Sequence, residues 1–208
     1  MAATSTGIYH RSYPRELALR HTRAEYFRLA LLAVAMVAAP EDQAALNSQA
    51  LSLAGPASDP RARDWRASLL NNLGWIRFDA DELDEALALF EEAVEERVRM
   101  GKAREIVVAK WCVGRTLRAL GRTDEAMRGQ LDLVQWMATA ELTDSFVEEE
   151  IGECLVALAR PGEAAAHFAV AADLLAARGP GEEPDPERLA RLRDRSIQIN
   201  TTPEPGTG

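Results

Sequence analysis

The sequence repeats one spaced pattern three times, and this repetition restricts the chain to folds that are built from equivalent units. In each copy an aliphatic residue and a glycine are followed, twelve residues after the glycine, by an alanine with a glutamate before it. The glycines are Gly74, Gly114 and Gly152, and the alanines are Ala86, Ala126 and Ala164. Phe90 and Phe168 stand four residues after their alanines, and Gln130 takes that place in the middle copy. The glycines are spaced 40 and 38 residues apart, which predicts an array of equivalent supersecondary units.

Each unit is expected to be a pair of helices. Hydrophobic residues make up 47% of the chain and aromatic residues only 6%, and strand-forming runs of Val, Ile, Thr and Tyr are scarce. The glycine then lies on the first helix of each pair and the alanine near the start of the second. A glycine inside a helix costs about 1 kcal/mol relative to alanine. We therefore expect each glycine to lie opposite the alanine of its own copy, where two antiparallel helices cross closely.

Residues that favour helix ends set the expected boundaries. Gly101 and Gly121 are placed as helix stops. Pro161 fits the first turn of a helix, and Ser145 with Glu148 fits a capping box. The six helices of the three copies are expected at about 62–79, 82–100, 103–120, 123–139, 144–159 and 161–178.

The repeated pattern resembles the tetratricopeptide repeat, whose signature reads W-x2-L-G-x2-Y…A-x3-F…P. The first copy is the most similar, and it matches at Leu73, Gly74, Ala86 and Phe90. Leu70, Arg77 and Val98 stand where the signature has Trp, Tyr and Pro. The resemblance covers about residues 62–178. It implies an all-α fold, an α-solenoid in which antiparallel helix pairs stack into a right-handed superhelix, and a role in protein-protein interaction.

The rest of the chain is expected to divide around this array. Residues 1–14 are expected to be a flexible N-terminus, and residues 15–60 a degenerate helical pair with its turn at Pro40-Glu41-Asp42. Residues 179–208 are expected to form a short capping helix, ERLARLRDR, and a disordered tail from Asn200. The three tetratricopeptide-like repeats occupy residues 61–178, divided as 61–101, 102–140 and 141–178.

One apolar segment, Leu29–Ala39, allows three interpretations. It follows an Arg-rich leader and ends in small residues, as a secretory signal does, and a cleaved signal before Pro40 would indicate export. The leader contains Glu16 and Glu25, however, and the apolar run continues a helical pattern that starts near Arg15. We therefore expect a core helix in a cytoplasmic protein, with a homodimer interface as the other alternative.

The sequence holds no group of residues that is typical of catalysis. His10, His21 and His167 lack metal-ligand spacing, and Cys112 and Cys154 are expected to be buried, reduced thiols. The glycines stand singly, so no phosphate-binding loop is predicted. The net charge of −9 argues against a nucleic-acid partner, and no apolar run is long enough to span a bilayer. We expect no enzyme activity, no catalytic residue, no metal or cofactor, and no nucleic-acid or membrane partner.

The resemblance also implies which residues face a ligand. In the tetratricopeptide family the first helices line the concave side of the superhelix, with ligand-facing positions three residues before the glycine, one after it and four after it. In this chain these positions hold Asn71, Trp75, Phe78, Trp111, Arg115, Arg118, Glu149, Glu153 and Val156. The alternative is that the tryptophans fill space between stacked pairs and that the arginines neutralise neighbouring glutamates.

These observations together predict a non-catalytic module that binds a peptide or helix of another protein in its concave groove. The alternative is a homo-oligomeric assembly element that uses the apolar helix at Leu29–Ala39. The identity of the partner does not follow from the sequence.

Overall fold

The structure is a computed structural model that describes residues 40–54, 60–177 and 184–201. These residues form α-helices joined by short turns, and no strand occurs among them. The helices are α2 (Pro40–Ala54), α3 (Pro60–Asp79), α4 (Leu83–Met100), α5 (Ala103–Ala119), α6 (Thr123–Thr139), α7 (Ser145–Ala157), α8 (Pro161–Ala176) and α9 (Pro186–Thr201). The chain divides into two compact units, Met1–Trp65 and Arg66–Gly208. The all-α class predicted from the sequence is confirmed.

In the first unit, helix α2 differs from the prediction at its start. The sequence places Pro40-Glu41-Asp42 in a turn, but in the structure these residues form the first turn of α2. This prediction is wrong because proline is well tolerated at the first position of a helix and acidic residues there complement the helix dipole. The apolar segment Leu29–Ala39 lies outside the described residues, so its three interpretations stay predictions.

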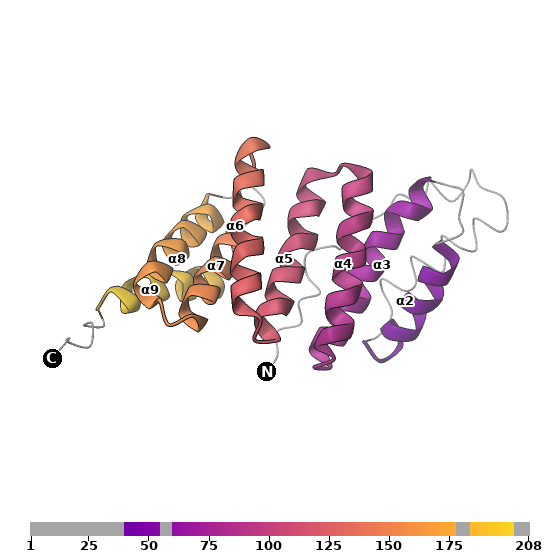
Figure 1. The fold of residues 1–208 in the computed structure, drawn as a ribbon, viewed down its shortest axis with the longest axis horizontal. Coiled ribbons are helices and arrows are strands. Elements are labelled where there is room, and N and C mark those ends of the chain that lie inside the picture. Colours follow the sequence, from indigo (N-terminus) through magenta and orange to yellow (C-terminus); the bar gives the residue numbers. More distant parts are fainter. Residues whose placement is uncertain (1–39, 55–59, 178–183, 202–208) are drawn as a thin grey trace. The chain divides into compact units, whose positions relative to one another are not determined.

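In the second unit, consecutive helices from α4 to α9 pack against each other in chain order (Figure 1). Three-residue turns join α3 to α4, α5 to α6 and α7 to α8, so the helices of each pair run antiparallel. The first helices α5 and α7 also contact each other. Gly101 and Gly121 follow α4 and α5 with φ of 68° and 77°, as their predicted role as helix stops requires. All six predicted helices are present, with ends within two residues of the predicted ones.

The repeat glycines are buried as predicted, but the residue nearest to each of them is not the alanine. A Cβ atom on Gly74 would lie 2.5 Å from Cε1 of Phe90, and one on Gly152 would lie 2.7 Å from Cε1 of Phe168. In the middle pair the Gln130 amide takes the place of the ring. The contact therefore forms one helical turn beyond the predicted alanine. Glycine is required there because a side chain would displace the ring or the amide.

Asp144, rather than Ser145, caps the N-terminus of α7. Its carboxylate accepts hydrogen bonds from the backbone N–H groups of Phe146 at 2.8 Å and Val147 at 3.3 Å. Ser145 is already the first residue of the helix, so the predicted capping box of Ser145 with Glu148 is wrong. Aspartate is as strong an N-cap as serine, and its charge also complements the positive end of the helix.

The C-terminal helix is longer than predicted. Helix α9 covers Pro186–Thr201, whereas the sequence predicts a helix that ends at Arg195 and a disordered tail from Asn200. Asp185 caps α9 by accepting hydrogen bonds from two backbone N–H groups at 3.0 and 3.3 Å. No glycine or proline occurs between Arg195 and Thr201, so no helix-breaking residue interrupts the backbone hydrogen bonds of this segment.

The apolar core of the second unit is shared between neighbouring helix pairs. Its largest cluster draws residues from every helix between α5 and α9, among them Val107, Leu133, Ile151, Phe168 and Leu192. Two smaller clusters connect α4 with α5, α6 and α7. Cys112 and Cys154 lie in these smaller clusters as buried free thiols, and burial raises the pKa of Cys154 to about 12. Each pair is thus stabilised by the pair beside it.

Candidate interaction surface

Four aromatic rings form a continuous row on the first helices of the three pairs. In order along the row they are Phe78, Trp75, Trp111 and Phe146, from α3, α3, α5 and α7. The centroids of neighbouring rings lie 5.2, 5.7 and 5.2 Å apart. Every ring is half-buried, so each one packs against its neighbours and still presents part of its surface to solvent. We call these four residues the aromatic row.

The repeat pattern determines where the two tryptophans of this row lie. Trp75 follows Gly74 by one residue, and Trp111 precedes Gly114 by three residues, so both tryptophans occur at defined positions on equivalent helices. The Trp75 ring also lies 5.1 Å from the ring of Phe90, at an interplanar angle of 65°. The side chain that covers Gly74 therefore supports the aromatic row as well. Edge-to-face contacts of this kind contribute about 0.5–1.5 kcal/mol each.

Arg115 lies against three rings of this row. Its guanidinium carbon is 5.8 Å from the ring centroids of Trp75 and Trp111 and 5.7 Å from that of Phe78. Cation–π attraction holds an arginine in such a position. The Arg115 Nε atom is buried without a hydrogen-bond partner, and within the described part of the chain no carboxylate forms an ion pair with this residue. Arg115 therefore brings to the aromatic row a cation without a close ion-pair partner, although its charge also acts on the Glu150 carboxylate.

Arg118, in contrast, belongs to an ion pair within the fold. Its guanidinium donates to the Glu150 carboxylate at 2.5 and 3.2 Å. The Glu150 side chain is only 2% exposed, and burial raises its pKa, although the hydrogen bond and charge of Arg118 act in the opposite direction. Removing one partner of a buried pair leaves the other uncompensated. The geometry of Arg118 thus follows the alternative interpretation, in which an arginine neutralises a neighbouring glutamate.

Two of the three predicted ligand-facing residues of the third copy, Glu149 and Glu153, are paired with helix α9. Arg188 donates to the Glu149 carboxylate at 2.8 and 2.6 Å. Arg195 forms a bidentate pair with Glu153, in which the second contact measures 3.1 Å. These arginines follow their partners by 39 and 42 residues, beyond the region that resembles a repeat. The sequence analysis therefore missed them.

The remaining predicted residues have separate environments. Asn71 accepts a hydrogen bond from the Cys112 thiol at 3.4 Å, which connects α3 with α5. Val156 is 38% exposed on α7. Phe146 is a member of the aromatic row that the sequence analysis did not place there, because it stands six residues before Gly152 and outside the three positions that the resemblance implies. An aromatic residue in the first turn of a first helix is the pattern that would have identified it.

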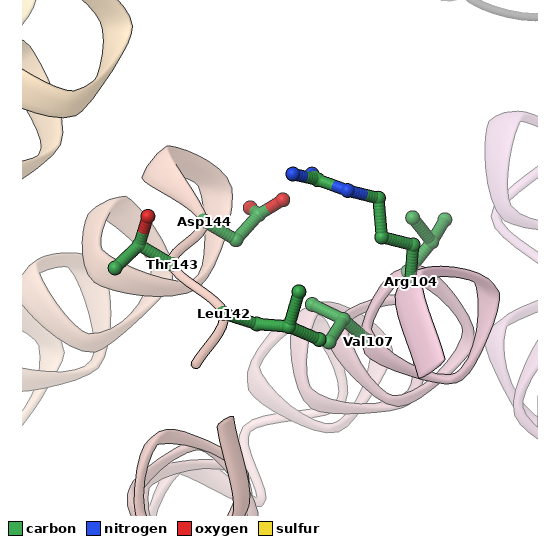
Figure 2. A pocket seen from close by; sticks show the side chains of 6 residues that line it. Arg104, Val107, Leu142, Thr143 and Asp144 are labelled. Atoms are coloured by element: carbon green, nitrogen blue, oxygen red, sulfur yellow. The ribbon is translucent and has the colours of Figure 1, made fainter. Parts of the chain in front are cut away.

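A small pocket lies between the start of α5 and the turn before α7. Its volume is about 50 Å³, and it is lined by Arg104, Val107, Val108, Leu142, Thr143 and Asp144. The Arg104 guanidinium and the Asp144 carboxylate face each other across it (Figure 2). Sites for small organic ligands typically measure about 300–1,000 Å³. This pocket is thus too small for such a ligand.

Within the described ranges, no group of three or more His, Cys, Asp and Glu residues is arranged to hold a metal ion. None of the helices in these ranges has the length and apolar character that crossing a membrane requires.

In the second unit helix pairs stack in chain order, with a glycine covered by a ring or an amide at each crossing, and this is the architecture of an α-helical repeat protein. Residues 66–100 match the family model described as tetratricopeptide repeat, so the chain carries this repeat on α3 and α4. The resemblance stated from the sequence is confirmed. No curated protein matches the sequence.

Solved structures of similar fold cover most of the chain. Tetratricopeptide-like repeats of a Podosopora anserina protein described as a kinesin light chain give a TM-score of 0.56 at 17% identity, over 86% of this chain and 87% of that one. A double mutant of MamA from RS-1 gives 0.51 at 13% identity, over 86% and 95%. BtubC from P. vanneervenii gives 0.50 at 13% identity, over 88% and 84%. At such identities the likeness establishes the fold alone, a tetratricopeptide-like α-solenoid.

Proposed function

We propose that this protein is a non-catalytic adaptor that binds a peptide or helix of another protein on the aromatic row, with Arg115 as the charged anchor. The observation that carries the proposal is the contact of Arg115 with three half-buried rings and its lack of an ion-pair partner within the described residues. Tryptophan and arginine are the residues most enriched among interface residues that dominate binding energy. Tetratricopeptide proteins generally act as protein-protein interaction modules, and this supports the same class of function here.

The chemistry of the row favours a partner segment with an acidic side chain next to an apolar one. A carboxylate can form charge-assisted hydrogen bonds with the Arg115 guanidinium. An apolar side chain next to it would bury the accessible parts of Trp75 and Trp111, which are half-buried now. We leave Arg118, Glu149 and Glu153 out of the proposed binding residues, because each of them already forms an ion pair within the chain.

The absence of catalysis and a cytoplasmic location belong to the same proposal. Family members are typically non-catalytic scaffolds, and a reducing compartment would keep the two buried thiols free. The alternative of self-association through Leu29–Ala39 stays a prediction. Size-exclusion chromatography with light scattering tests it, since a monomer at all concentrations would remove it.

Site-specific photocrosslinking in the source cells tests where the partner binds. A photoreactive amino acid in place of Phe78, at the end of the aromatic row, is expected to crosslink to the partner. The same amino acid in place of Leu131, which is 40% exposed on the second helix α6, is expected not to. Equal crosslinking at both positions, or crosslinking at Leu131 alone, would contradict binding at the row.

Affinity measurements on the crosslinked partner segment then test the anchor. Arg115→Met keeps the length of the side chain and removes its charge, and we expect it to weaken binding about tenfold or more. Arg122→Met is the matched control, because Arg122 is exposed in the turn between α5 and α6 and pairs with Glu125. A partner segment that binds both variants as tightly as it binds the wild type would rule out the proposed anchor.

A further inference from the structure

Helix α9 covers a surface of α7 and α8 that combines acidic and aromatic side chains. The two carboxylates of this surface, Glu149 and Glu153, bind Arg188 and Arg195. The same guanidiniums lie over rings, with Arg188 3.6 Å from the Phe146 centroid and Arg195 4.1 Å from the Phe168 centroid. We call Phe146, Glu149, Glu153 and Phe168 the α9-covered surface.

One face of α9 makes all of these contacts. Arg188, Leu192 and Arg195 stand at positions i, i+4 and i+7, which share one side of an α-helix. Leu192 is 1% exposed and joins the large core cluster, while each arginine contacts one carboxylate and one ring. The α9-covered surface is thus complementary to a basic amphipathic helix with the pattern Arg-x3-Leu-x2-Arg.

The opposite face of α9 is exposed, and no helix among the described residues packs on it. Ala190, Arg193, Asp194 and Ile197 lie along this face. Only Arg188 and Leu192 are buried among the described side chains of α9, whereas α5 and α7 each bury seven residues. Two ion pairs therefore contribute to the attachment of α9 beside the packing of Leu189 and Leu192 on the core cluster, and this ionic part is subject to screening by salt. Such a helix can leave its place more easily than any first helix of the array.

We propose that the α9-covered surface is a second docking site, which takes a partner helix with two arginines and an intervening leucine at the spacing of Arg188, Leu192 and Arg195. Helix α9 is the intramolecular competitor for this site. It is covalently attached within a short distance, so its effective concentration is about millimolar or higher. A partner helix displaces α9 when its affinity for the surface, or its local concentration, is high enough to overcome the effective concentration of α9. The proposal rests on other contacts than the aromatic row does, although Phe146 belongs to both surfaces.

A peptide with the sequence of residues 186–201, labelled with a fluorophore, tests the proposal against the full chain by fluorescence anisotropy. Arg188→Glu with Arg195→Glu in the full chain places like charges opposite Glu149 and Glu153, which releases α9 and leaves the surface intact. We expect the peptide to bind this variant about tenfold or more tightly than it binds the wild type, because the competitor is removed. Arg191→Glu with Arg193→Glu makes the same change of charge at two exposed positions and is expected to leave peptide binding at the wild-type level.

Reversal of the surface charges provides the specificity test. Glu149→Arg with Glu153→Arg in a chain that keeps the native α9 sets arginines against Arg188 and Arg195, which releases α9, and is expected to abolish binding of the native peptide. A peptide that carries Arg188→Glu and Arg195→Glu is expected to restore binding to this chain, because the released α9 cannot compete for the reversed surface, and an unfolded protein could not give this restoration. Arg115→Met, on the aromatic row, is expected to have no effect on peptide binding. Equal peptide affinity for the wild type and the α9-released variant, or no restoration by the charge-reversed peptide, would overturn the proposal.

Hydrogen exchange on the wild-type chain gives an answer even if the released variant does not fold. Amides of α9 are expected to exchange faster than those of α7, and to lose more protection between about 0.05 and about 0.5 M NaCl. Protection of α9 equal to that of α7 at both salt concentrations would show that α9 is a fixed part of the fold, and the proposal would fail.

Discussion

At the crossing of α5 and α6, Gln130 takes the place that Phe90 and Phe168 have in the other two pairs. Gln130 is fully buried, and neither Nε2 nor Oε1 of its amide has a hydrogen-bond partner in the described part of the chain. An unsatisfied buried polar group costs about 1–3 kcal/mol. We predict that Gln130→Phe raises the free energy of unfolding in urea by about 1–3 kcal/mol. The reciprocal change Phe90→Gln is expected to lower it by about 3 kcal/mol or more, and a neutral or destabilising Gln130→Phe would contradict this account of the crossing.

Gly74 gives a second prediction at the residue scale, in which two effects have opposite signs. Helix propensity alone favours alanine over glycine by about 1 kcal/mol, whereas a Cβ atom on Gly74 would lie 2.5 Å from the Phe90 ring. We expect overpacking to dominate, so that Gly74→Ala lowers the free energy of unfolding by about 1–3 kcal/mol. Gly129→Ala is the control, because Gly129 lies within α6 and a Cβ atom there has no neighbour within 4 Å. That control is expected to be stabilising, and a stabilising Gly74→Ala would show that the glycine is not needed for packing.

At the scale of single helices, the structure and the sequence-based prediction differ at the N-cap of α7. Asp144 accepts two backbone hydrogen bonds, while Glu148, the other member of the predicted capping box, contacts His167 at 2.8 Å. We predict that Asp144→Ala lowers the free energy of unfolding by about 1 kcal/mol. Asp144→Asn keeps the capping oxygen and is expected to change stability much less. Urea denaturation of the two variants checks this, and equal losses would mean that the cap does not stabilise α7.

The sequence predicted the helices of the array well because their ends depend on local chemistry. Gly101 fits a left-handed cap, and Pro161 fits a helix start. It predicted the end of α9 poorly, because no glycine or proline follows Arg195 before Pro203, so nothing local marks a stop at Arg195. The sequence also does not decide between Asp144 and Ser145 as the N-cap of α7, because both residue types are strong N-caps and the two residues are adjacent.

At the scale of the whole molecule, the ion pair of Arg118 with Glu150 joins two neighbouring helix pairs and has a consequence for pH. Burial raises the pKa of Glu150 above its ordinary value of 4.5, against the opposing effect of Arg118. The folded chain therefore holds this proton more tightly than the unfolded chain does. The protonation of Glu150 therefore contributes to stability at low pH, and this contribution is lost as the pH rises from about 4.5 through the raised pKa.

We predict that the stability of the wild type relative to Glu150→Gln decreases between about pH 4 and about pH 7. Urea denaturation of both proteins over this range measures the difference, and the other carboxylates are common to both and largely cancel. Parallel pH profiles, or a relative gain of the wild type with rising pH, would contradict the assigned direction of the pKa shift.

The candidate site could be predicted from the sequence only where it follows the repeat. Trp75 and Arg115 each follow their repeat glycine by one residue and Trp111 precedes its glycine by three, and the structure brings these three residues together. The arginines that pair with Glu149 and Glu153 lie outside the repeats, so no periodicity indicated that α9 covers these two residues. Contacts between a repeat array and a non-repeating terminal helix depend on tertiary packing that a repeated pattern does not encode.

The most direct test of the account uses the tryptophans themselves as probes. The chain has four tryptophans: Trp75 and Trp111 belong to the aromatic row, Trp65 is buried, and Trp136 lies on α6. Fluorine NMR of protein labelled with 5-fluorotryptophan would follow all four during titration with the crosslinked partner segment. The account predicts that the resonances of Trp75 and Trp111 shift and that the resonance of Trp136 does not. Shifts at Trp136 with none at Trp75 and Trp111 would contradict it, because the partner would then bind the second helices instead of the aromatic row.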